Sequence, residues 1–181
     1  QHPLFTYLED IKIKQQSYKK FASIMAHNFE KNKKYFHAIE YPYKRSSTAY
    51  LVASGPSLNE TIQWIKETSD KVDVYVVGSA LKLLLNEGVK PYAAVISDAQ
   101  PTIMKQLDAS YNGNLYFLST ANAEAVASHN GLRIPIFQQG YPTAEMLAKT
   151  LNMPMLETGG SVSTVTISLL EYLGYDQIVM F

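Results

Sequence analysis

Short apolar runs alternate with stretches of helical periodicity from residue 49 to residue 181, and this alternation constrains the fold more than any other feature. Runs that are apolar on both faces are typical of strands buried between two layers of helices. Strands joined by helices are parallel, and their crossovers are right-handed. The sequence therefore predicts an α/β protein with a doubly wound, mostly parallel open sheet, which is a Rossmann-like architecture.

Six strands are expected in this sheet, with helical patterns between them. Gly88 follows the helical stretch 79–87, in keeping with a glycine just past a helix end. Pro135 lacks the amide that a central strand needs, so we expect its run to lie at a sheet edge or not to form a strand. The expected strands cover residues 49–53, 74–77, 92–96, 115–118, 134–137 and 177–181.

A long amphipathic helix is expected before the sheet. Apolar residues recur at three- and four-residue steps from Leu4 to about Phe36, with lysines among the intervening residues. A basic helix of this kind can face RNA or a membrane, but the interspersed acidic and apolar residues favour a solvated face on a packing helix. We assign residues 1–40 to this helix, 41–48 to a linker and 49–181 to a Rossmann-like nucleotide-binding domain.

The last strand, over residues 177–181, stops without the loop expected after it. We therefore expect the domain to be truncated at its C-terminus and the chain to be a fragment of a longer protein.

Bulk composition excludes several classes of function. The 16 basic and 16 acidic residues balance, so no overall field recruits nucleic acid or an anionic membrane. Without cysteine there is no disulfide, zinc–cysteine site or thiol nucleophile. No apolar run approaches the roughly 20 residues that span a bilayer, and no signal-peptide pattern is present, so a cytoplasmic location is our default expectation. The histidines lack metal-site spacing and are expected to be surface or internally satisfied residues: His2, His27, His37 and His129.

The ligands of open parallel sheets bind beyond the carboxyl ends of the strands, where backbone amides at helix starts face the cleft. The first loop at this edge contains Ser54, Gly55, Pro56 and Ser57. Its glycine admits close backbone approach and its proline has no amide to offer, while Ser57 can cap the next helix in a capping box with Glu60. Because neither GxGxxG nor a Walker A lysine is present, a ligand site and an ordinary capped turn both stay open.

The second and third loops at this edge are Gly78-Ser79 and the segment that contains Asp98. A carboxylate at this position can bind a ribose hydroxyl, hold Mg²⁺ through water or act as a general base. Local sequence alone favours a plainer role for Asp98, the N-cap of the helix expected after Pro101.

The fourth loop contains Gly159, Gly160, Ser161 and Thr164 and leads into a helical pattern. Paired glycines before a hydroxyl-rich helix start can present amides and hydroxyls to a phosphate. The alternative is a flexible turn with Ser161 as a helix cap. Four hydroxyl residues lie within the seven positions 158–164, which is more than capping needs and favours anion binding.

Five motifs stand in a characteristic order and spacing: the runs 51–58, 78–81, 88–91 leading to Ser97-Asp98, 159–162 and 173–176. Together they resemble the DUF115 family, which includes the motility-associated-factor flagellin glycosyltransferases and the archaeal 6-hydroxymethylpterin diphosphokinases. The resemblance covers about residues 49–181. Five ordered motifs are much more specific than any single loop.

The strand and loop 51–58 are also similar to those of a bacterial sialyltransferase family that holds the CMP part of a CMP-sugar there. This resemblance implies that Ser54, Gly55, Pro56 and Ser57 line the nucleotide, that Ser79 faces it and that Asp98 lies beside the ribose, phosphates or metal. The sialyltransferases carry asparagines in place of Ser54 and Ser79, which leaves the nucleobase open. Their catalytic histidine falls beyond residue 181, so no histidine of this chain takes that role.

Two functions follow from these resemblances, and a third stays open because a fold does not determine a function. The first is a glycosyltransferase-like domain that binds a nucleotide-activated sugar, CMP-nonulosonic acid, for transfer to a glycan or a protein such as flagellin, with Asp98 as the candidate catalytic residue. The second is diphosphate transfer from ATP to a hydroxymethylpterin, which requires Mg²⁺ and makes Asp98 a metal ligand. The third is a non-catalytic module whose long helix docks a partner.

Overall fold

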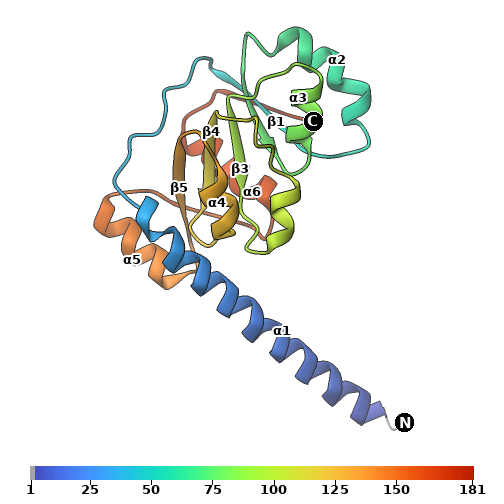
Figure 1. The fold of residues 1–181 in the computed structure, drawn as a ribbon, viewed down its shortest axis with the longest axis vertical. Helices are drawn as coiled ribbons and strands as arrows, with labels where there is room; N and C mark the ends of the chain where they lie inside the picture. Colours follow the sequence, from blue (N-terminus) through green and yellow to red (C-terminus); the bar gives the residue numbers. More distant parts are fainter. Residues whose placement is uncertain (1–2) are drawn as a thin grey trace.

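A single parallel sheet organises the molecule (Figure 1). The computed structural model describes the backbone of residues 3–181 and the side chains of Glu9 and of residues 11–181. The strands are β1 (Thr48–Val52), β2 (Asp73–Val77), β3 (Ala93–Ile96), β4 (Asn114–Leu118), β5 (Arg133–Gln138), β6 (Met155–Leu156) and β7 (Gln177–Met180). The helices are α1 (Pro3–Asn32), η1 (Lys33–Tyr35), α2 (Leu58–Thr68), α3 (Ala80–Asn86), η2 (Pro101–Lys105), α4 (Ala123–Ser128), α5 (Pro142–Leu151) and α6 (Val162–Tyr172), where η marks a 3₁₀ helix.

The strand order β6-β5-β4-β3-β2-β1-β7 places the helices on both faces of the sheet. Strands β1 to β6 follow one another in a single direction, so right-handed crossovers bring their connecting helices to one face. The chain then returns past β1 to form β7, and α6 covers the opposite face, behind the strands in Figure 1. The doubly wound parallel architecture expected from the sequence is confirmed, and its direction of winding reverses between β1 and β7.

Strand β5 is an ordinary member of the sheet, although it contains Pro135. It pairs with β4 along Leu115–Leu118, while β6 reaches only its last two residues. The amide of Leu115 bonds to the carbonyl of Leu132 and that of Ser119 to Ile136, so the backbone of Pro135 faces away from β4. The nitrogen of Pro135 therefore lies on the β6 side of the strand, where the two-residue β6 does not reach. The proline thus costs β5 no hydrogen bond to β4.

The C-terminal end of α1 lies across the carboxyl ends of β3 and β4. The Nδ2 group of Asn28 donates to the carbonyls of Ala99, at 2.9 Å, and Thr120, at 3.2 Å. Asn32 donates to the carbonyls of the two residues that flank Thr120, at 3.2 and 2.9 Å. Both asparagines are buried, and the carbonyls they bind need partners away from water. These hydrogen bonds fix the direction of α1 relative to the sheet.

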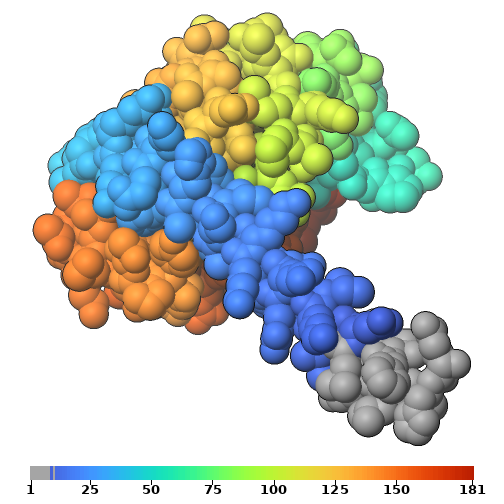
Figure 2. Space-filling model, turned by 60° about the horizontal axis from the view of Figure 1, so that its bottom comes forward, coloured from blue at the N-terminus to red at the C-terminus, as the bar shows by residue number. Residues whose placement is uncertain are grey.

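Apolar packing on α1 is confined to the same end. Phe29 is buried and its ring lies 5.6 Å from that of Tyr141, so α1 passes between α4 and α5 (Figure 2). Farther from the sheet, Ile13 is 60% exposed, Tyr18 76% and Phe21 42%. The expected packing face therefore meets the domain only near the C-terminus of α1, and the preceding turns extend away from it (Figure 1).

The segment between η1 and β1 is fastened to the amino ends of the strands by a buried carboxylate. Asp73, fully buried at the start of β2, accepts bonds from the amide and the Nε of Arg45, each at 2.8 Å. It also accepts from the hydroxyl of Tyr175 at 2.8 Å. Burial raises the pKa of Tyr175, which keeps this hydroxyl a donor. A buried carboxylate needs such partners, and this one holds the expected linker at the amino ends of the strands.

In the described part of the chain, no helix combines the length and the hydropathy that a membrane crossing requires.

Replacing Asn28 by alanine should lower the free energy of unfolding by about 2–4 kcal/mol, because two buried carbonyls and the amide of Ala123 lose their partner. Urea unfolding of Asn28→Ala beside Asn59→Ala, which alters an exposed asparagine of α2, measures this effect. Equal stabilities of the two variants would show that the side-chain bonds do not hold α1.

Candidate nucleotide-binding site

Three adjoining cavities lie along the carboxyl ends of β1, β2 and β3. The inner cavity, about 360 Å³, is lined by Ser54, Gly55, Pro56 and Ser79. The central cavity, also about 360 Å³, is lined by Gly78, Asp98, Gly160, Ser161 and Phe21. The outer cavity, about 420 Å³, is lined by Tyr18, Lys20, Phe21 and Gln100. Each volume lies within the range of roughly 300–1,000 Å³ that is usual for small-molecule sites.

The loops after β1 and β2 meet through two hydroxyls. Ser54 Oγ lies 2.7 Å from Ser79 Oγ, and both side chains are exposed at the inner cavity. The chain bends sharply after β2 because Gly78 has a φ of +62°, a conformation that favours glycine. Ser54 and Ser79, two of the residues that the resemblance placed around a nucleotide, therefore meet at one point of the sheet edge.

Ser57 does not form the expected capping box. Its φ and ψ of −68° and −18° are already helical, and its side chain makes no cap hydrogen bond. A capping side chain needs an extended backbone to reach the first amides. The carbonyl of Ser57 instead accepts bonds from the amides of Glu60 and Thr61, at 3.1 and 3.2 Å. The exposed hydroxyl of Ser57 is thus not committed to the helix start.

Gly55 is not required by the fold itself. A Cβ atom at this position would lie 3.7 Å from Ser57 Oγ, which is ordinary van der Waals contact. The residue also lies outside the positive-φ conformations that exclude other side chains. A glycine here therefore leaves room for close approach of a ligand to the backbone. The fold alone would accept alanine at this position.

Asp98 holds its own loop and not a helix start. Its Oδ1 accepts the amide of Gln100 at 2.9 Å, and its carbonyl accepts the amide of Asn122 at 2.9 Å. The expected role as N-cap is wrong, because the residue before η2 is Gln100 and η2 is a short 3₁₀ turn. Within residues 11–181, Asp98 Oδ2 accepts no hydrogen bond, so this oxygen remains free beside the central cavity.

The loop before α6 combines a cap with a cavity wall. Ser161 Oγ accepts the amide of Thr164 at 3.1 Å and lies 2.8 Å from Thr164 Oγ1. A Cβ on Gly159 would come within 2.3 Å of Thr164 Cγ2, and Gly160 has a φ of +81°. Ser161 therefore caps α6, which is the alternative that the sequence left open. Gly160 and Ser161 nevertheless line the central cavity, and the described residues offer no acceptor to the first-turn amides of Val162 and Ser163.

Two side chains of the central cavity were not expected from the sequence. Gln106 Oε1 would lie 3.5 Å from a Cβ on Gly78, and Phe21 enters from α1. Gln106 follows η2 without any motif that marks it. Phe21 belongs to the apolar pattern of α1, but that pattern does not specify which end of the sheet the helix crosses.

Charge is sparse along the three cavities. Asp98 and Lys20 are the only charged residues that line them among the described side chains. The side chains of the described region form no group of three metal-ligand types. Asp98 therefore fits Mg²⁺ only as a single carboxylate ligand, with further oxygens coming from bound phosphates.

None of the described histidines lines the three cavities, although His27 lines a separate cavity beside Asn28 and Ala99. His27 and His37 are exposed, whereas His129 is buried with Nε2 2.8 Å from the carbonyl of Gly113. Burial lowers the pKa of His129. The expectation for His2 lies outside the described residues.

The fold has a counterpart among known structures. The structure of MAf glycosyltransferase from Magnetospirillum magneticum AMB-1 is similar over 80% of this chain and 24% of its own, with 18% identity and a TM-score of 0.68. The chain thus spans about a quarter of that protein's length, and the likeness is one of fold. No curated protein matches the sequence.

The family model that matches residues 23–181 is described as 6-hydroxymethylpterin diphosphokinase MptE-like. This match includes the last turns of α1 together with the whole sheet. The resemblance inferred from the five ordered motifs is confirmed, and the chain belongs to the MptE-like family.

Proposed function

We propose that this domain binds a nucleotide-activated sugar, a CMP-linked nonulosonic acid, and passes the sugar to a hydroxyl of a glycan or of a protein such as flagellin. The observation that carries the proposal is the meeting of Ser54 and Ser79 at the inner cavity, next to a central cavity that contains Asp98. The likeness in fold to a MAf glycosyltransferase supports it.

The nucleoside occupies the inner cavity in this proposal. Gly55 permits its close approach, and the hydroxyls of Ser54, Ser57 and Ser79 supply exposed donors and acceptors. No cation lines this cavity among the described residues, so nucleoside recognition rests on hydroxyls and backbone groups.

The phosphate lies in the central cavity, toward the start of α6. Val162 lines this cavity, the first-turn amides of Val162 and Ser163 lie at the positive end of the helix dipole, and Gly160 leaves space nearby. These groups stabilise the negative charge that develops on the phosphate as the bond between the sugar and the phosphate oxygen breaks.

Asp98 accepts the proton of the acceptor hydroxyl in this scheme. The acceptor oxygen forms a bond to the anomeric carbon while CMP leaves, and the proton passes to the free Oδ2. The hydrogen bond from Gln100 to Oδ1 orients the carboxylate. Most of the rate enhancement then comes from holding donor and acceptor in line.

A second function, diphosphate transfer from ATP to a hydroxymethylpterin, is favoured by the description of the matching family model. It uses the same cavities but gives Asp98 a different task, the binding of Mg²⁺ between phosphate oxygens. In this case nucleotide binding depends on the metal.

CMP should bind the complete protein in calorimetry, and Gly55→Ala should weaken binding about tenfold, since the added methyl group occupies space that the ligand uses. The free energy of unfolding should not change. Ser79→Ala should also weaken binding, whereas Ser69→Ala, at the opposite end of α2, should not. Failure of CMP, CMP-sugars, ATP and GTP to bind the unaltered protein would reject a nucleotide site.

Asp98→Asn should lower the turnover number for sugar transfer by about a hundredfold or more, since the amide keeps the Gln100 hydrogen bond but accepts no proton. CMP affinity should persist in EDTA. Turnover and calorimetry with and without EDTA separate the two functions, because loss of all nucleotide binding in EDTA points to the diphosphokinase. Full turnover by Asp98→Asn would remove Asp98 from the chemistry.

A further inference from the structure

The outer cavity is built by α1, a helix to which the proposed reaction gives no part. Tyr18, Lys20 and Phe21 form its α1 side, and Gln100 lines it from the α/β domain. Phe21 also lines the central cavity, and the amide of Gln100 bonds to Asp98. The outer cavity is therefore next to the place where the sugar–phosphate bond lies.

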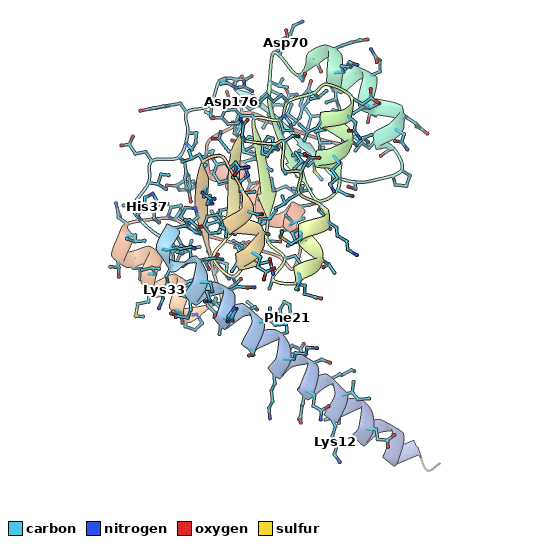
Figure 3. All side chains as sticks on the ribbon, in the orientation of Figure 1. Lys12, Phe21, Lys33, His37, Asp70 and Asp176 are labelled. Carbon is cyan, nitrogen blue, oxygen red and sulfur yellow. The ribbon has the colours of Figure 1, made fainter. Side chains whose placement is uncertain are left out.

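Two aromatic rings in this cavity are open to solvent. Tyr18 is 76% exposed and Phe21 42%, and neither ring stacks on another aromatic ring of the described chain. Phe21 lies on the flank of α1 that is near the α/β domain (Figure 3). Rings with an exposed face beside polar groups are well suited to pack against the apolar face of a ligand ring.

Lys20 gives the outer cavity its charge. It is the only cation that lines the three cavities in the described chain, and no carboxylate of that part lies within salt-bridge distance of it. An ammonium without an anionic partner, beside two aromatic rings, favours a ligand that joins a ring to a negative group.

The position of these residues is fixed by the anchor of α1. Phe21 precedes Asn28 by seven residues, or two helical turns, which corresponds to about 10 Å along the axis. Asn28 bonds to the carbonyl of Ala99, between Asp98 and Gln100. This hydrogen bond joins α1 to the Asp98 loop and so fixes Phe21 relative to Gln100.

We propose that the outer cavity is the subsite for an acidic sugar, whose ring packs on Phe21 and Tyr18 and whose carboxylate pairs with Lys20. This inference rests on the proposed function, because it assigns the sugar of a CMP-linked donor to the cavity beyond the phosphate. In this arrangement the nucleoside, the phosphate and the sugar occupy the inner, central and outer cavities in turn.

The test compares two ligands, CMP and CMP-N-acetylneuraminic acid, by calorimetry on the complete protein. Lys20→Ala and Tyr18→Ala should each weaken binding of the CMP-sugar about tenfold and leave CMP affinity unchanged, because both residues line only the outer cavity. Lys20→Arg should restore CMP-sugar affinity, because it keeps the charge. The matched controls are Lys12→Ala and Ile13→Ala, exposed positions farther out on α1 that line none of the three cavities (Figure 3).

The outcomes separate the inference from the function on which it rests. Normal CMP binding, with CMP-sugar affinities of Lys20→Ala and Tyr18→Ala equal to those of the controls, overturns the subsite and leaves the nucleotide site intact. Equal losses in the controls overturn it as well, because the effect then belongs to α1 as a whole. Absence of CMP binding by the unaltered protein rejects the proposed function and the subsite together.

Discussion

The buried amides of Asn28 and Asn32 determine how this molecule is assembled at its ligand edge. Each donates to two backbone carbonyls of the loops that follow β3 and β4. Such bonds are directional and their loss inside a protein is costly, so they define where α1 crosses the sheet. The helix covers the carboxyl ends of β3 and β4, while the loops after β1 and β2 stay accessible. One side of the candidate site is thus a helix from outside the α/β repeat.

The opposite edge of the sheet is closed by different chemistry. Asp73 binds Arg45 and Tyr175 at the amino ends of the strands and holds the segment before β1 there. The sheet is then secured at one edge by an ion pair whose carboxylate is buried and at the other by side-chain amides. Between these two, the reversal of winding beside β1 leaves the hydroxyls of Ser54 and Ser79 at the inner cavity and the Asp98 carboxylate at the central cavity.

The sequence predicted those parts of the fold that depend on local patterns. The runs apolar on both faces indicated the strands, and the topology of parallel sheets then placed Ser54, Ser79 and Asp98 at one edge. Details that depend on backbone conformation were missed: Ser57 begins its turn in a helical conformation and forms no capping box, and Asp98 bonds to Gln100 and caps no helix. Serine and aspartate carry the same hydrogen-bonding groups whether or not they cap a helix, so the residue type alone does not predict a cap.

Local sequence patterns could not predict the role of α1 at the site, for a different reason. Asn28 and its partner Thr120 are separated by 92 residues, and no spacing in the sequence signals such a contact. The two-residue β6 is likewise too short to leave a pattern. The apolar periodicity of α1 predicted a helix, but Phe21 reaches the central cavity only because distant carbonyls orient that helix.

Hydrogen exchange of the complete protein with and without CMP tests the central claim most directly. The account predicts slower amide exchange in peptides that cover residues 53–60, 76–82, 97–101 and 158–165, since these loops surround the inner and central cavities. Peptides at the amino ends of the strands, over residues 43–47 and 173–176, should exchange at unchanged rates. Protection confined to those amino-end peptides, or none at the carboxyl edge under saturating CMP, would contradict the account.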